Sequence, residues 1–311
     1  MSKTLVPQDD TDTTGEYPTL KTRPPRVAVE IGAESDVGKV RTNNEDHYLV
    51  AKLAKSMRIC RTSLPEDWST RFADEEGHLL VVADGMGGVV GGERASRLAV
   101  ETIEGFILNV VQWFLHLGTA KPTNVEETIE GNGTPIVNEL RKAFERADAT
   151  VIARAQAEPN LHGMGTTLTM AYSVGTEMFL VHAGDTRAYL YRDGELRQIT
   201  DDHTLVEALV KSGVITPEAA RTHARRNVVT NVIGGPNQGV YAEVHRLEIL
   251  DGDLLLLCSD GLTEPVDDDQ IASVLARHRD PEYACRRLVE LAIQNGAPDN
   301  VTAVVARYSV R

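Results

Sequence analysis

The sequence has little cysteine, no long apolar run and no secretory signal pattern. Its three cysteines are few and odd in number, and Cys258 stands inside an apolar stretch, which is typical of a core residue. A transmembrane helix needs about 18 or more consecutive apolar residues, and the chain contains no such run. We therefore expect a protein of the reducing cytoplasm that has no membrane partner.

Basic residues are also scarce compared with acidic ones. The chain has 32 lysines and arginines against 46 aspartates and glutamates, which gives a net charge of −14. An acidic chain repels polyanions, so nucleic acid and anionic membrane surfaces are disfavoured as partners. The same excess suits a protein that gathers aspartates to hold cations. Because no set of histidines and cysteines has the spacing of a zinc site, a harder cation is the better candidate.

The chain is expected to form one domain with a tail. Residues 1–25 are polar and include four prolines, which predicts a disordered N-terminal segment. No internal repeat or long linker divides the remainder, and an apolar fraction of 41% permits a substantial core. We therefore expect a single catalytic domain over residues 26–309.

Strand-like segments cluster along the chain, and long helical segments separate the clusters. Strands are expected at residues 27–31, 40–53 and 166–199, and long helices at residues 93–117 and 136–158. Asp193 and Gly194 form a typical two-residue hairpin turn. Asp267 and Asp280 are typical N-caps of two further helices. Neighbouring strands joined by short turns indicate antiparallel sheets, so the pattern predicts an α+β fold.

The segment LLVVADGMGG, residues 79–88, is the stretch around which the chain is organised. Its apolar half predicts a buried strand that ends at Asp84. Gly85, Gly87 and Gly88 allow a positive φ and let a ligand or ion approach the backbone. Taken alone, the segment is also explained by a strand followed by an ordinary Asp-Gly turn.

The same pattern recurs at other places in the chain. The motif LLLLCSD ends in Asp260, Asp299 precedes a third apolar strand, and RTNNED adds two more acidic residues, Glu45 and Asp46. Carboxylates at the ends of several buried strands can converge, and they then repel one another unless a cation neutralises them. Carboxylate and carbonyl oxygens are hard ligands. The sequence therefore predicts a magnesium or manganese site.

Seven motifs stand in a fixed order: RTNNED, VVADGMGG, MGTTL, AGDTRAYL, DDHTLV, LCSDGL and APDNVTAVV. In this order the chain resembles metal-dependent protein phosphatases of type 2C, in their bacterial form, over residues 27–308. The resemblance implies a four-layer α-β-β-α sandwich, in which two antiparallel sheets are flanked by helices and a metal site lies at one edge. It also implies hydrolysis of phosphoserine and phosphothreonine in proteins by water that two Mg or Mn ions activate.

The resemblance also implies a set of metal ligands. Asp84 bridges the two ions, and the carbonyl of Gly85 coordinates one of them. Asp260 and Asp299 bind the other ion. Because all three core aspartates are present, an active enzyme is favoured over a pseudophosphatase that keeps the fold as a binding module. A hydrolase of small phosphate esters differs from this enzyme only in its substrate.

Other acidic and basic residues receive secondary roles by the same resemblance. Glu45 and Asp46 contact water held by the metals, and Arg41 clamps the substrate phosphate with its guanidinium fork. Asp185 either belongs to an ordinary turn or holds a third, weaker ion together with Asp260. Glu264 is a further candidate for that third ion. Phosphorylated proteins are the expected partners, and a Ser/Thr kinase is a candidate partner.

Two further features concern the leaving group and the choice of substrate. Met86 takes the place where many eukaryotic members have a histidine, and a thioether cannot donate a proton. The general acid is therefore unassigned, and metal-bound water is one candidate. Residues 205–231 correspond by resemblance to the flap beside the active site. This flap carries Arg221, Arg225 and Arg226 in a chain of net charge −14. The cluster either balances nearby acidic residues or steers phosphopeptides to the site.

Overall fold

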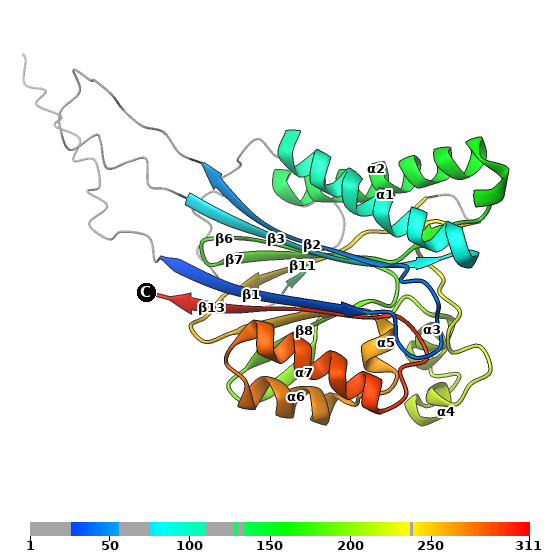
Figure 1. Ribbon diagram of the computed structural model, residues 1–311. Helices are drawn as coiled ribbons and strands as arrows, with labels where there is room; N and C mark the ends of the chain where they lie inside the picture. Colours follow the sequence, from blue (N-terminus) through cyan, green and yellow to red (C-terminus); the bar gives the residue numbers. More distant parts are fainter. Residues whose placement is uncertain (1–25, 56–74, 110–126, 130–133, 237–238) are drawn as a thin grey trace, which may run out of the picture.

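The computed structural model describes residues 26–55, 75–109, 127–129, 134–236 and 239–311. Within these residues, two antiparallel sheets pack face to face, and helices cover both outer faces (Figure 1). This four-layer arrangement confirms the predicted α+β sandwich. The predicted tail at residues 1–25 lies outside the described residues and stays a prediction.

The first sheet contains both the first and the last strand of the described chain. Its strands are β1 (Val27–Asp36), β8 (Arg187–Arg192), β9 (Glu195–Gln198), β12 (Leu254–Cys258) and β13 (Val301–Val310). They lie in the order β1-β13-β12-β8-β9. The predicted turn between β8 and β9 is confirmed, because Asp193 and Gly194 both have positive φ, 53° and 88°.

The second sheet is larger and contains the central strand. Its strands are β2 (Asp46–Lys55), β3 (Glu75–Met86), β4 (Glu127–Thr128), β5 (Gly165–Thr166), β6 (Leu168–Val174), β7 (Glu177–Ala183), β10 (Ile233–Gly234) and β11 (Glu243–Glu248). They lie in the order β10-β5-β3-β6-β7-β11-β4, and β2 also pairs with β3. On β3, Leu79 and Val81 join the core under the helices, whereas Leu80 and Val82 join the core between the sheets. Burial of both faces explains the unbroken apolar run.

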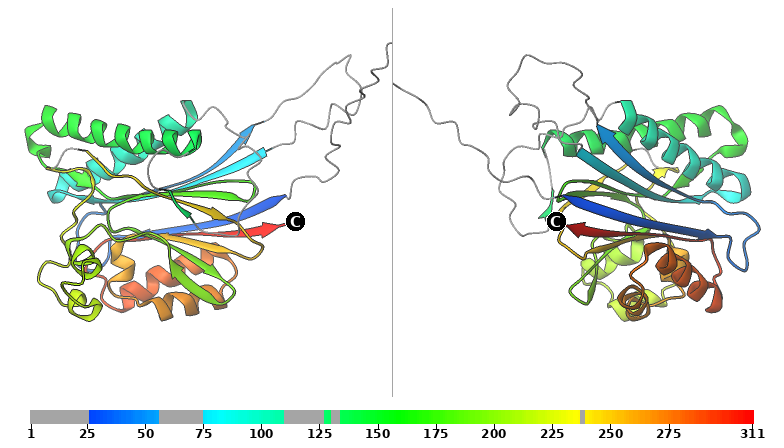
Figure 2. Two further views of the ribbon diagram at one scale, coloured as in Figure 1. Left: turned by 180° about the vertical axis from the view of Figure 1, so that it is seen from behind. Right: turned by 60° about the vertical axis from the view of Figure 1, so that its left-hand side comes forward.

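Helices form the two outer layers (Figures 1 and 2). Those on the second sheet are α1 (Gly88–Asn109) and α2 (Pro135–Ala157), and those on the first are α6 (Asp268–Arg277) and α7 (Pro281–Gln294). The short helices are α3 (Leu205–Lys211), α4 (Pro217–Arg221) and α5 (Asp260–Thr263). The predicted N-caps Asp267 and Asp280 both accept backbone N–H groups. No helix in the described parts of the chain is both long and apolar enough to cross a bilayer.

Two predicted boundaries differ from the structure. Strand β2 begins only at Asp46, so residues 41–45 of RTNNED form a loop and only its last residue lies in the strand. Backbone groups of this loop bond to the side chain of Asn300, which takes the place of a strand partner. Helix α1 begins at Gly88, ahead of its predicted start at residue 93. Its glycine-rich first turns have low helix propensity, so the pattern does not predict them.

Of the glycines beside Asp84, Gly85 acts differently from the prediction and Gly87 confirms it. Strand β3 continues past Asp84, because Gly85 and Met86 pair with β5 instead of turning. A Cβ on Gly85 would lie 2.2 Å from the carbonyl oxygen of Gly92, so this position needs glycine for close packing. Gly87 has a positive φ of 129° and allows the chain to leave the strand.

Candidate metal and phosphate site

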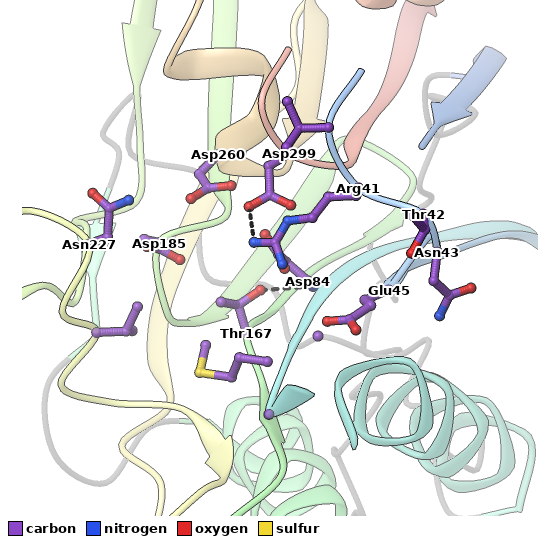
Figure 3. A pocket seen from close by; sticks show the side chains of 15 residues that line it. Arg41, Thr42, Asn43, Glu45, Asp84, Thr167, Asp185, Asn227, Asp260 and Asp299 are labelled. Atoms are coloured by element: carbon purple, nitrogen blue, oxygen red, sulfur yellow. Dashed lines mark hydrogen bonds and ion pairs between the residues drawn. The ribbon is translucent and has the colours of Figure 1, made fainter. Parts of the chain in front are cut away.

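A pocket of about 510 Å³ lies where residues from both sheets and from the flap meet. Figure 3 shows its acidic side chains around one space, with the Arg41 guanidinium among them. The predicted site residues that line it are Arg41, Glu45, Asp84, Gly85, Asp185, Asp260 and Asp299. The fold therefore brings these residues together from separate parts of the sequence.

Strand pairing explains why the aspartates converge. Asp46 lies opposite Asp84 in the register of β2 and β3. Strands β12 and β13 are antiparallel neighbours, and Asp260 follows the first just as Asp299 precedes the second. The loop that carries Asp185 joins β7 to β8 and so crosses from one sheet to the other. The site consequently spans one end of the sandwich.

The aspartates resist ionisation because they are buried and close together. Burial, with the charges of Asp46 and Asp260, raises the pKa of Asp84 well above its ordinary value. Burial and the charge of Asp185 do the same to the pKa of Asp260. Burial raises the pKa of Asp46 to about 6, and burial with the charge of Asp202 raises the pKa of Asp185 to about 6. Such a cluster needs nearby positive charge to ionise fully at neutral pH.

Unpaired oxygen atoms show that this donor set fits a hard cation. Asp46 Oδ1 and Asp260 Oδ1 are buried and have no hydrogen-bond partner. The other oxygen of Asp46 accepts hydrogen bonds from the hydroxyls of Ser259 and Thr302, each at 2.7 Å. A divalent cation would satisfy the unpaired oxygens. Among the described residues, no three His, Cys, Asp or Glu side chains form a ready-made metal cluster.

Arg41 forms a contact that the sequence does not predict. Its guanidinium donates to Asp299 Oδ2 at 2.7 Å, and this hydrogen bond raises the pKa of Arg41. The two residues are 258 positions apart in the chain. The Arg41 side chain is still 52% exposed, so part of the guanidinium fork faces the solvent. The predicted phosphate clamp is therefore tied to a predicted metal ligand.

The loop that carries Arg41 is held by one buried amide that sequence analysis missed. Asn300 donates to the carbonyls of Val37 and Asn43, at 3.0 and 2.9 Å. Its own carbonyl accepts from the backbone N–H of Glu45 at 2.8 Å. These bonds fix the chain on both sides of Arg41. The position of Asn300 directly after Asp299 is the only signal in the sequence.

The motif MGTTL fixes the backbone of Asp84. The N–H of Asp84 donates to Thr167 Oγ1 at 3.0 Å. Its carbonyl accepts from Thr166 Oγ1 and from the N–H of Thr167, at 2.8 and 2.9 Å. Thr167 also lines the pocket. The motif that marked the resemblance thus holds the central aspartate in place.

The structure changes the expected role of several outer residues. Glu264 is exposed and does not line the pocket, although its charge contributes to raising the pKa of Asp260. Asn227 and Val229 bring the flap into the pocket lining, and nothing in their residue types marks them beforehand. The predicted basic cluster of the flap is exposed and lies outside this lining.

Comparisons with known proteins agree with this arrangement. The sequence profile of the family described as Protein phosphatase 2C matches residues 59–291. Serine/threonine protein phosphatase PstP of Mycobacterium tuberculosis is 37% identical over 282 residues, which cover 90% of this chain and 45% of that protein. Serine/threonine phosphatase stp of Listeria welshimeri is 32% identical, and the match covers 89% of this chain and 94% of that protein. The chain thus spans less than half of the first relative.

A solved structure adds information on metals. It is the catalytic domain of the serine/threonine protein phosphatase PstP in complex with two manganese ions. Its similarity to this chain has a TM-score of 0.68 at 34% sequence identity, and covers 91% of this chain and all of that one.

Proposed function

The chain belongs to the protein phosphatase 2C family, and we propose that it hydrolyses phosphoserine and phosphothreonine in proteins with Mg²⁺ or Mn²⁺. The observation that carries this proposal is the convergence of Asp84, Asp260 and Asp299 on one pocket that Arg41 also lines. The two manganese ions of the similar PstP catalytic domain support it. A chain that served only as a binding module would not need all of these acidic groups.

The donor set suggests where the ions would be held. The proposed ligands are Asp84, the Gly85 carbonyl, Asp260 and Asp299 for two ions, with Asp185 for a third. Ions bound there would activate a water molecule and neutralise charge on the phosphoryl oxygens. Asp46 supports the site from behind Asp84, because two hydroxyls hold one of its oxygens and leave the other free for the site. Glu45 adds a further acceptor at the pocket wall.

Arg41 is the proposed phosphate ligand. A planar guanidinium donates two parallel hydrogen bonds to phosphate oxygens, which an ammonium cannot do. Its bond to Asp299 keeps the guanidinium at the pocket, and the Asn300 anchors keep its loop in place. The clamp is therefore arranged before substrate arrives, which lowers the entropy cost of binding.

The proton for the leaving alkoxide is assigned to water. Met86 lines the pocket and carries no proton to donate. No histidine is found among the described residues of the pocket lining. An imidazole acid of the kind found in many eukaryotic members is therefore not part of the proposed mechanism.

The proposed substrates are proteins phosphorylated by Ser/Thr kinases, which makes such a kinase the opposing enzyme. The cytoplasm remains the proposed compartment. Cys258 and Cys285 are free and buried thiols, which suits a reducing environment.

An assay on purified protein tests the proposal. Phosphoserine, phosphothreonine and phosphotyrosine peptides of matched sequence are incubated with the chain after chelation, and again after addition of Mn²⁺ or Mg²⁺. We expect release of phosphate from the first two peptides only when metal is present. The Asp84→Asn variant is the matched control for contaminating phosphatases. Activity that is equal in this variant, or that persists after chelation, would contradict the proposal.

A further inference from the structure

One histidine of the motif DDHTLV joins the flap to the loop that carries Asp185. This residue, His203, has no catalytic role predicted from the sequence, and its side chain is only 14% exposed. It lies after β9 of the first sheet and immediately before the flap, which begins with α3. Its hydrogen bonds reach three separate segments, and Gly184 is held twice, because its carbonyl also accepts from the backbone N–H of His203 at 2.7 Å.

The backbone of His203 ties down the far end of the flap. Its carbonyl accepts from both the N–H and the hydroxyl of Thr230, at 2.8 and 2.9 Å. Next to it, Thr204 forms a β-bridge with Val229, and the N–H of Leu205 donates to the carbonyl of Val228. The flap therefore leaves and returns to the body of the protein at one point, beside this histidine.

The ring of His203 extends this tie to the catalytic pocket. Its Nδ1 accepts from the N–H of Gly184 at 3.2 Å and from the side-chain amide of Asn231 at 2.8 Å. Gly184 directly precedes Asp185, and Asn231 ends the flap. Asn231 is itself fixed, because it exchanges hydrogen bonds with the backbone of Tyr241 in both directions. One nitrogen thus bridges the flap and the Asp185 loop.

The opposite side of the ring fixes its tautomer. His203 Nε2 lies 2.9 Å from a carboxylate oxygen of Glu243. Glu243 is buried and also bonds to His245 and to the N–H of Asp201. Although burial opposes it, these histidines hold the pKa of Glu243 below its ordinary value, so the carboxylate is an acceptor. His203 consequently donates from Nε2 and accepts at Nδ1.

We propose that His203 is a positioning residue that sets the place of the flap over the pocket. Because its Nδ1 holds Asn231 against Gly184, it fixes the adjoining flap residues Asn227 and Val229, which line the pocket. The inference rests on the proposed function only in taking this pocket to be the active site. The contact between His203 and the flap can be measured without any activity. A histidine that only filled space would not need its Nδ1 to accept hydrogen bonds from Gly184 and Asn231.

Two substitutions separate the two sides of the ring. In His203→Asn the short amide can place its carbonyl near the Nδ1 position, which keeps the acceptor for Gly184 and Asn231 but loses the donor to Glu243. In His203→Gln the longer amide can place its N–H₂ near the Nε2 position, which keeps that donor but loses the acceptor. The pair therefore predicts opposite effects on flap order and on stability.

Limited trypsin digestion reports flap order, because Arg221, Arg225 and Arg226 are exposed in the flap. We expect cleavage there to be roughly five- to tenfold faster in His203→Gln, the effect of losing an ordinary hydrogen bond, and close to wild type in His203→Asn. The melting temperature should show the reverse order. It should fall by roughly 3–8 °C in His203→Asn, which leaves Glu243 short of a donor, and change less in His203→Gln. Asn231→Ala removes the same tie from the flap side and should reproduce the fast cleavage.

Kinetics complete the test. His203→Gln should raise the KM for a phosphopeptide more than it lowers kcat, and it should affect p-nitrophenyl phosphate less. Equal flap cleavage in the Asn and Gln variants, or slow cleavage in Asn231→Ala, overturns the proposal even if the enzyme is active. An inactive wild-type protein whose two variants still differ in flap cleavage overturns the proposed function and leaves the role of His203 in place.

Discussion

The carboxylate floor of the pocket and the flap beside it are built in opposite ways. The floor comprises Asp84, Asp260 and Asp299, which line the pocket and lie on or next to β3, β12 and β13, and Asp46 lies opposite Asp84 on β2. The flap, residues 205–231, has two short helices and exposed arginines and is tied to the body at its ends. Elements with few buried contacts open at low free-energy cost. The comparison suggests that chemistry belongs to the rigid floor and substrate choice to the adjustable flap.

Removal of a floor carboxylate should have the largest effect. Asp84→Asn, Asp260→Asn and Asp299→Asn each keep the side-chain shape but lose a charged ligand. We expect kcat to fall by roughly 10²–10³-fold or more in each variant, the scale of losing a preorganised electrostatic group at the reacting centre. Steady-state kinetics in saturating Mn²⁺ measure this. Near-normal rates in any of the three variants would remove that residue from the proposed ligand set.

Metal binding should stabilise the floor more than any other part of the protein. At 100 times its Kd, a bound ion adds about 2.7 kcal/mol to the free energy of unfolding. For a chain of this size we expect a rise in Tm of roughly 5–10 °C. In metal-free buffer, Asp84→Asn should melt at or above the wild-type temperature, because it removes a buried acid whose ionisation is opposed by burial and by its acidic neighbours. Thermal melts with EDTA and with Mn²⁺ test both statements. If Mn²⁺ does not change the Tm of the wild type, the carboxylates of the floor do not bind the metal.

Substitution of Arg41 should have an effect smaller than that of a floor carboxylate and larger than that of the flap arginines. Arg41→Ala should raise the KM for phosphopeptide, and the inhibition constant of inorganic phosphate, roughly tenfold, since a charged bidentate pair is lost. Affinity for Mn²⁺ should hold or improve, because Asp299 loses its competing partner. Arg41→Lys is the matched control and should recover the charge but not the fork. Impaired Mn²⁺ binding with unchanged phosphate inhibition would show that Arg41 serves the structure instead.

Charge on the flap should have the smallest and most selective effect. Arg225→Glu with Arg226→Glu should lower kcat/KM roughly two- to fivefold for a phosphopeptide with acidic flanks, and the difference should fade as salt rises. Hydrolysis of p-nitrophenyl phosphate should barely change, because it is too small to reach the flap. The double change Arg277→Glu and Arg279→Glu alters the net charge equally but lies at the end of α6, outside the flap, and is the matched control. Equal losses on both substrates would show that the flap arginines support the site and do not guide substrates.

Local patterns predicted the floor because its physics is local. A strand buried on both faces must be apolar along its whole length, so the apolar run at residues 79–83 predicts a buried strand. Asp84 follows this strand directly. The recurrence of Asp after apolar strands at Asp260, and before one at Asp299, predicted a convergent acidic site. The hairpin at Asp193 and the helix caps depend on neighbouring residues and were predicted for the same reason.

The tertiary structure alone decided what connects these elements. The pairing of Arg41 with Asp299, and the anchoring of the Arg41 loop by Asn300, join residues more than 250 positions apart. Such contacts depend on the antiparallel pairing of β1 with β13, which sets Asp36 opposite Val301 and which no local pattern specifies. The contacts of the His203 ring likewise exist only because the fold places Asn231 beside Gly184. Residue type and spacing determined which groups this protein can use for chemistry. Strand register determined which of them meet, because a carboxylate, guanidinium or imidazole acts through whatever the fold places within hydrogen-bond reach.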